Sequence, residues 1–208
     1  HILQVYRRMP VTFVRGEGSW LFDDLDRRYL DLLSGLAVTS LGHAHPAVAQ
    51  ALSEQASTLL QVSNLFATVP GPQVAVTLDR LLGGGGKVFF ANSGAEANEC
   101  AIKLARKFAG APAGRHKVIS AFGSFHGRTL ATLHATGQPA KHEPFQPLPE
   151  GFVHVAWDDL DALERPHLVA RGHQVSVVTS TQAVDRRVRK LVDGVEVFHG
   201  RIRPTHAR

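Results

Sequence analysis

The sequence predicts an α/β protein in which short apolar strands alternate with amphipathic helices. Val88 to Phe90 form an apolar run of strand type, and residues 94–108 then repeat apolar side chains at intervals of three and four. Two further apolar segments, residues 118–122 and 152–157, read as strands. In an open α/β sheet, ligands bind just beyond the carboxyl ends of the strands. The loops that follow these strands are therefore the first places to look for a site.

The N-terminal third is predicted to hold short strands followed by two helices. Residues 11–15, 19–22 and 29–33 are extended segments joined by turns. Pro46 stands near the first position of a helix, where proline is tolerated, and residues 72–82 form a second amphipathic helix. The apolar face expected for the first helix consists of Val48, Ala49, Leu52, Ala56, Leu59 and Leu60.

Four consecutive glycines and Lys87 follow the second helix and superficially resemble a phosphate-binding P-loop. A P-loop has Ser or Thr directly after its lysine and then a helix, whereas Val88 follows here and opens a predicted strand. We interpret residues 83–86 as a connector into that strand.

A capped helix start is expected directly after the strand. Asn92, Ser93 and Gly94 break the apolar run, and Ser93 with Glu96 fits a capping box. Such a turn presents free N–H groups at the positive end of a helix, and Gly94 has no Cβ to keep a ligand away. The turn is a candidate anion site, although the same pattern also marks an ordinary capped helix.

The helix that begins there is predicted to bury one apolar face. Glu99 and Lys103, four residues apart in the favourable order, are expected to pair on its outer side. Cys100 is the single cysteine; we interpret it as a small core residue, and its isolation suits a reducing compartment. The predicted buried face consists of Ala97, Cys100, Ala101, Leu104, Ala105 and Phe108.

Charge is distributed unevenly along the 208 residues. The net charge of +5 arises in the tail, because residues 1–164 carry 14 basic and 15 acidic side chains and residues 165–208 carry 9 and 3. The body therefore offers no case for nucleic-acid binding. The apolar runs are too short to cross a bilayer, so we expect no membrane association.

Two sequence motifs point to a family. NSGAEANE at 92–99 and SFHGRT at 124–129 resemble the class III aminotransferases, which use pyridoxal 5′-phosphate (PLP), and within them the acetylornithine aminotransferases. The segment from Gly16 to Val48 is similar to the family's N-terminal segment. SNLF at 63–66 resembles the stretch that lines the active-site entrance.

The resemblance implies part of a fold-type I PLP-dependent transferase: the N-terminal segment of the small domain and the first half of the large α/β domain. It implies a small-domain segment at 1–70, a partial PLP-binding domain at 71–164 and a divergent basic tail at 165–208. The family reaction moves an amino group from acetylornithine to 2-oxoglutarate. A cytoplasmic homodimer is implied for the full-length family.

Five site residues follow from the resemblance. It places Ser93, Gly94 and Ala95 at the cofactor phosphate, Phe125 against the cofactor ring and Arg128 at the substrate carboxylate. A flat apolar ring suits stacking on a heteroaromatic ring, and a guanidinium can hold two carboxylate oxygens. The alternative for Arg128 is a surface salt bridge.

The histidines near these motifs are assigned structural roles. For His126 we expect a hydrogen bond that stabilises its loop rather than an acid–base role. His43 and His45 could suggest a metal site, but two histidines that are expected to have no nearby carboxylate or thiolate partner make a poor one, so turn and capping roles are favoured.

The resemblance is predicted to end near Glu164. The family's ring-nitrogen aspartate and Schiff-base lysine do not follow, and none of the six lysines, 87, 103, 107, 117, 141 and 190, matches the latter. We assign no catalytic residue and expect a chain truncated before that lysine and inactive alone. The basic run from Arg186 to Lys190 is expected to be a solvated helix face. A non-catalytic PLP-binding or interaction fragment is the alternative function, and a glycosyltransferase-like fragment, suggested by residues 167–180 and 193–202, is a weaker one.

Overall fold

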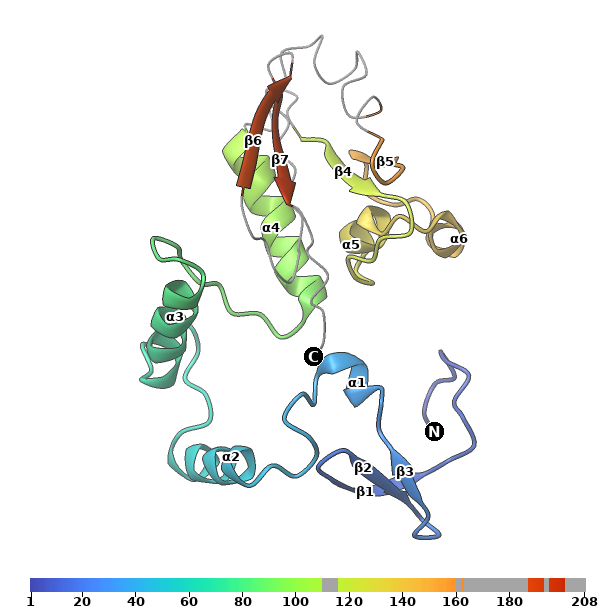
Figure 1. Ribbon diagram of the computed structural model, residues 1–208, viewed down its shortest axis with the longest axis vertical. Helices are drawn as coiled ribbons and strands as arrows, with labels where there is room; N and C mark the ends of the chain where they lie inside the picture. Colours follow the sequence, from blue (N-terminus) through green and yellow to red (C-terminus); the bar gives the residue numbers. More distant parts are fainter. Residues whose placement is uncertain (110–115, 160–161, 163–186, 193–194, 201–208) are drawn as a thin grey trace. The chain divides into compact units, whose positions relative to one another are not determined.

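The chain forms two compact units, residues 1–77 and 78–208. The computed structural model is shown in Figure 1. Among the helices that it describes, none is both long and apolar enough to cross a membrane. The structure describes residues 1–109, 116–159, 162, 187–192 and 195–200.

A three-stranded antiparallel sheet begins the first unit. Its strands are β1 (Phe13–Glu17), β2 (Trp20–Asp23) and β3 (Arg28–Leu30), paired in the order β1-β2-β3. The three short strands predicted for this region are confirmed, with boundaries that shift by a few residues. Phe13 of β1 meets Tyr29 of β3 edge to face, with ring centroids 5.3 Å apart, which is a favourable aromatic geometry.

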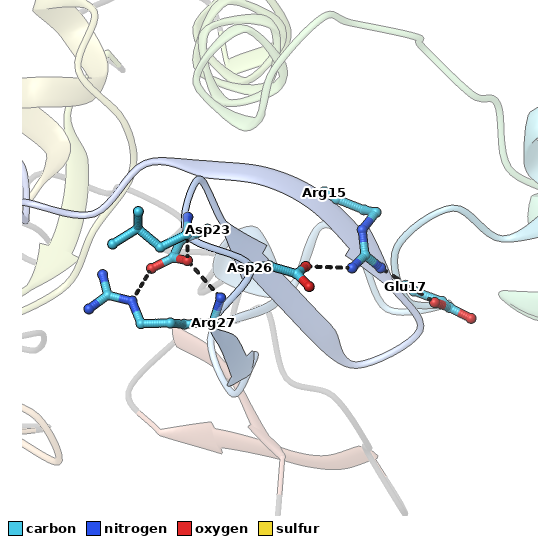
Figure 2. Close-up of polar contacts among 6 residues, drawn as sticks. Arg15, Glu17, Asp23, Asp26 and Arg27 are labelled. Carbon is cyan, nitrogen blue, oxygen red and sulfur yellow. Dashed lines mark hydrogen bonds and ion pairs between the residues drawn. The ribbon is translucent and has the colours of Figure 1, made fainter.

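Asp23 is the polar centre of this sheet. Its carboxylate accepts hydrogen bonds from the Arg27 N–H at 2.8 Å and the Arg27 Nε at 2.7 Å (Figure 2). It also accepts the Leu25 N–H at 3.0 Å and the Tyr29 hydroxyl at 2.9 Å. Burial alone would raise the pKa of Asp23. The hydrogen bonds from Arg27, Tyr29 and Leu25 outweigh it and lower the pKa to about 2. The buried carboxylate thus closes the turn between β2 and β3.

The other charged contacts of Figure 2 lie at the surface. Arg15 approaches Asp26 at 3.1 Å and Glu17 at 3.8 Å. Exposed pairs of this kind contribute about 0–1 kcal/mol, so these two ion pairs add little to the stability of the sheet.

Asp31 fastens the segment after the sheet. Its Oδ1 accepts the N–H groups of Leu33 and Ser34, and its Oδ2 lies 2.7 Å from His43 Nε2. His43 also pairs with Gly18 through two backbone hydrogen bonds. The expectation that His43 lacks a carboxylate partner is therefore wrong, because Asp31 reaches it from 12 residues upstream. Its expected role in a turn, rather than at a metal, fits these contacts.

Two helices complete the first unit and lead into the second. The predicted start of α2 (Pro46–Thr58) at Pro46 is confirmed. His45 is the N-cap residue, as expected, and its backbone carbonyl accepts the Val48 and Ala49 N–H groups, but its side chain makes no capping hydrogen bond. The predicted apolar face of α2 is exposed at every position, because no described element of this unit packs over it. With the preceding loop, Val48, Ala49 and Leu52 line an open apolar hollow of about 400 Å³.

The helix predicted at 72–82 is confirmed as α3 (Pro70–Leu81). The glycine connector also matches the structure: Gly83, Gly84 and Gly85 have φ values of +100°, +80° and +82°. Only glycine adopts such angles at low cost. Asp79 Oδ1 accepts the Gly86 N–H at 2.6 Å and holds the end of the connector.

The second unit contains a long helix and a pair of parallel strands. They are α4 (Gly94–Ala109), β4 (Val118–Ala121) and β5 (Phe152–Val155), and β4 pairs with β5 in parallel register. The strands predicted at 118–122 and 152–157 are confirmed. Three short helical segments, which the sequence did not predict, connect them: α5 (Leu130–Ala135), α6 (Pro139–His142) and η2 (Glu143–Phe145).

A small core lies between α5 and the two strands. Leu133, Ala135 and Leu148 are its buried apolar side chains. Gly137 crosses directly beneath β4, since a Cβ there would lie 2.0 Å from the Ala121 carbonyl oxygen. Only a glycine allows this backbone approach.

Two predicted elements are wrong, and one helix face is not buried. Residues 88–90 form no strand, because within the described residues β4 pairs only with β5 and gives them no partner. Residues 187–192, expected on a helix, form strand β6 (Arg187–Val192), which pairs antiparallel with β7 (Val195–Gly200). The apolar face of α4 is largely uncovered, with Leu104 60% and Phe108 95% exposed.

Candidate functional site

The predicted anion turn lies at the first residues of α4. Ser93 precedes the helix, and its Oγ accepts the Glu96 N–H at 3.2 Å. The Glu96 carboxylate accepts the Asn92 N–H at 2.6 Å, one residue earlier than in a regular capping box. These two bonds hold the turn and use neither the Gly94 N–H nor the Ala95 N–H.

The first N–H groups of an α-helix have no partner within the helix. Among the described residues, none accepts a hydrogen bond from Gly94 N–H or Ala95 N–H. A Cβ built on Gly94 meets nothing within 4 Å, and its φ is not left-handed. Gly94 is therefore suited to the turn by its open surroundings and not by an unusual backbone angle. Free donors, open space and the helix dipole together fit an anionic phosphate.

The second predicted segment, residues 123–129, connects the end of β4 to α5. Gly123 N–H donates to the Gly137 carbonyl at 2.7 Å, and Ser124 Oγ accepts the Gly137 N–H at 3.2 Å. Gln138 Nε2 donates to the Ser124 carbonyl at 3.1 Å. These bonds fix the loop just beyond the carboxyl end of a parallel strand, where ligands of α/β sheets bind.

Thr136 supports the middle of the same loop. Its Oγ1 accepts the His126 N–H at 2.9 Å and donates back to α5, to the Thr132 carbonyl at 2.9 Å. His126 Nδ1 lies 3.4 Å from Ser124 Oγ. The contacts of His126 thus fit the loop-stabilising role expected for it.

The structure brings the loop directly against the start of α4. A Cβ added to Gly127 would lie 2.7 Å from Ala95 Cβ, far inside contact distance. Asn98 Nδ2 donates to the His126 carbonyl at 2.7 Å, and the Thr129 hydroxyl donates to the Glu99 carboxylate. Two segments more than 25 residues apart in sequence therefore form one surface.

Phe125 and Arg128 project from this loop. Phe125 is 61% exposed, so its ring is available to a flat ligand. The guanidinium carbon of Arg128 lies 5.3 Å from the Phe125 ring centroid, a cation–π distance. No carboxylate among the described residues forms an ion pair with Arg128. The surface salt bridge considered for Arg128 is thus not formed within the part of the chain that the structure describes.

Sequence reasoning missed the residues that join the two segments. Glu99 was expected to pair with Lys103 along the helix, but its carboxylate binds Thr129 instead, and Lys103 has no ion pair within the described ranges. Asn98 was assigned no role. Their positions one turn into α4, beside the predicted anion site, were the only signal that they face the loop.

Cys100 is partly exposed on α4 rather than buried, so its predicted place in a core is wrong within the described chain. The neighbouring apolar positions of the helix are uncovered as well. Both observations have the same cause, because none of the described residues packs over that side of α4.

Comparison with solved structures places the chain in a fold class. An ornithine aminotransferase from Toxoplasma gondii ME49 matches 80% of the chain with a TM-score of 0.72 at 30% identity, over 41% of its own length. A Bacillus anthracis aminotransferase matches 78% with a TM-score of 0.71 at 34% identity, over 38% of its length. The described part of the chain thus has the fold of the N-terminal part of the fold-type I PLP-dependent transferases.

Sequence comparison then gives the family. The family model described as aminotransferase class-III matches residues 3–196. Acetylornithine aminotransferases from Nitrosomonas europaea and Gloeobacter violaceus are 51% and 50% identical to the chain over 169 and 167 residues. The chain belongs to the class-III aminotransferases, the PLP-dependent family that the two motifs resemble.

These alignments cover 79% and 78% of the chain but only 42% and 41% of the relatives. The chain spans about two fifths of the length of the curated relatives that it matches. The family match extends beyond Glu164 to residue 196. The predicted boundaries at 70/71 and 164/165 remain predictions.

Proposed function

We propose that this chain is the N-terminal part of a PLP-dependent aminotransferase and carries the phosphate-binding and carboxylate-binding parts of its active site. The observation that carries the proposal is the packing of Gly127 on Ala95. It joins an open anion turn to a loop that presents an aromatic ring and a guanidinium. Family membership supports PLP as the ligand that uses all three groups.

Each residue has a simple task in this proposal. The N–H groups at Gly94 and Ala95, with the Ser93 residue before them, hold the cofactor phosphate at the helix N-terminus. Phe125 packs on the cofactor ring. Arg128 binds the substrate carboxylate with two hydrogen bonds and so orients the substrate on the cofactor. PLP, when bound, acts as the electron sink that lets a proton leave the substrate Cα.

The amino donor is proposed to be acetylornithine and the acceptor 2-oxoglutarate. The names of the curated relatives at about half identity support acetylornithine. Arg128 can bind the carboxylate of either partner. Arginine biosynthesis, a homodimer and a cytoplasmic location belong to the same proposal. None of the six lysines is assigned as the covalent anchor of the cofactor.

A non-catalytic PLP-binding or interaction fragment is the second candidate function. It needs only the open turn at Gly94 and the exposed ring of Phe125, both of which the structure describes. The glycosyltransferase-like alternative depends on residues 167–180 and 193–202, most of which lie outside the described residues, and no described contact supports it.

The phosphate turn can be tested with Gly94→Val. A branched side chain at this open position would cover the free N–H groups, so PLP affinity, measured by fluorescence titration of the purified chain, should be abolished. Gly71→Val is the matched control, because Gly71 also lies in the first turn of a helix, has no left-handed φ, and would bring a Cβ no closer than 3.7 Å to its neighbours. Equal PLP affinity in wild type and Gly94→Val would contradict the proposal.

A further inference from the structure

Arg128 lies between two residues that both contact α4. Gly127 before it packs on Ala95, and Thr129 after it donates its hydroxyl hydrogen to Glu99. Ala95 and Glu99 are one turn apart on the same helix. The peptide of Arg128 is therefore fixed at both ends against the helix whose first residues form the anion turn.

Glu99 makes the polar half of this attachment. Its carboxylate is half-buried and receives the Thr129 hydroxyl and, at 3.4 Å, the Thr132 N–H. A carboxylate is a stronger hydrogen-bond acceptor than a neutral oxygen. No cation forms an ion pair with it among the described residues. The Glu99 carboxylate thus binds the Thr129 hydroxyl and the Thr132 N–H, two groups at the start of α5, shortly after Arg128.

The other contacts to this loop act farther from Arg128. Asn98 holds the His126 carbonyl, two residues before Arg128, and Thr136 holds the His126 N–H. Glu99 differs from both because its partner Thr129 is covalently adjacent to Arg128 on the side that leads into α5. Loss of the Glu99 contact would leave Thr129 held only by its capping contacts with Thr132 inside α5, while the Gly127 contact to α4 remained.

We propose that Glu99 is a positioning residue that sets the span between the anion turn and the Arg128 guanidinium. It thereby selects ligands that carry a phosphate and a carboxylate at one fixed separation. This inference depends on the proposed function, since it assumes that the turn holds a phosphate and Arg128 a carboxylate. A purely structural role for Glu99 would weaken every ligand equally or none.

The test compares two ligands that differ only in a carboxylate. N-(5′-phosphopyridoxyl)-L-alanine carries both the phosphate and a carboxylate, and N-(5′-phosphopyridoxyl)-ethylamine carries the phosphate alone. In calorimetric titrations of the wild-type chain, the alanine conjugate should bind about tenfold tighter than the ethylamine conjugate. This is the gain in affinity expected for a charged hydrogen-bonded contact. In Glu99→Gln the ratio should fall below about threefold, while affinity for the ethylamine conjugate changes by less than about twofold.

Control variants separate an effect on the position of Arg128 from an effect on the stability of the chain. Glu143→Gln makes the same chemical change at an exposed glutamate of η2 and should keep the wild-type ratio. Thr129→Ser keeps the hydroxyl, with its contacts to Glu99 and to Thr132, and should also keep the ratio. Thr129→Val removes the hydroxyl, and with it the α5 cap as well as the Glu99 contact, and should lower the ratio as Glu99→Gln does. If Glu99→Gln does not fold, the two Thr129 variants decide the question by the same ratio.

The outcomes distinguish this proposal from the proposed function. A wild-type ratio near one means that Arg128 does not bind the carboxylate, and failure of both conjugates to bind means that the turn does not hold a phosphate; either result overturns both proposals. A full ratio in Glu99→Gln or in Thr129→Val overturns only the positioning role.

Discussion

Gly127→Ala should separate the loop that carries Arg128 from the start of α4. The added Cβ would lie 2.5 Å from Thr132 Oγ1, 2.7 Å from Ala95 Cβ and 3.0 Å from Ala95 Cα. Ordinary contacts are 3.4–4 Å, so the loop must move by several tenths of an ångström or more. Overpacking of this kind costs about 1–3 kcal/mol. The φ of +140° at Gly127 is a region used almost only by glycine, which adds about 1–3 kcal/mol.

The combined loss of about 2–6 kcal/mol is large against a typical folding free energy of about 5–15 kcal/mol. For a chain of this size it corresponds to a Tm lower by roughly 4–24 °C, measurable by circular dichroism. PLP affinity, measured by fluorescence, should fall as well, because the Phe125 ring moves away from the turn. Gly123→Ala is the matched control: Gly123 lies in the same loop with φ +76°, but its Cβ would meet nothing within 4 Å. It should cost only about 1–2 kcal/mol. Equal Tm values for the two variants, with unchanged PLP affinity, would refute the packing argument.

Three further predictions address charge and pH. In a full-length enzyme that contains this segment, Arg128→Lys should weaken substrate use more than PLP binding, because loss of a bidentate carboxylate contact costs about 1.5–3 kcal/mol; unchanged kinetics for donor and keto acid would rule out the assignment. The pKa of Asp23 is lowered to about 2 from an ordinary value of 3.8, so its stabilising contribution is complete above about pH 4 and is lost as pH falls towards 2. Urea denaturation of Asp23→Asn should therefore show a flatter acid dependence in that window than wild type. Burial, with smaller contributions from His142 and His134, lowers the pKa of His154 below its ordinary value of 6.5. Stability should consequently fall as pH drops below about 6.5, and a His154→Gln variant with the same pH slope as wild type would contradict this.

Local chemistry made several elements readable from the sequence. Pro46 fixes a helix start because its ring presets φ and its missing N–H is not needed there. Ser93 and Glu96 define the first turn of α4 because capping depends on residues three apart in sequence. Gly83 to Gly85 end a helix for the same local reason.

Elements that depend on distant partners were predicted less well. An apolar run such as Val88 to Phe90 becomes a strand only if another strand hydrogen-bonds to it, and no described strand does. Helical periodicity in α4 correctly gave the helix but not its contacts. The side of α4 that meets the loop carries Asn98 and Glu99, whereas the apolar side, including Phe108, is exposed.

The sequence by itself determined the family, the two motifs and the residue types of the candidate site, because these depend only on residue identities and on short spacings along the chain. Only the tertiary structure decided that the two motifs meet, through Gly127 on Ala95 and Glu99 on Thr129. It also decided that Asp31 and His43 form a pair across 12 residues. The physical reason is that hydrogen bonds and close packing act over a few ångströms in space, and the separation of two residues along the chain does not fix that distance.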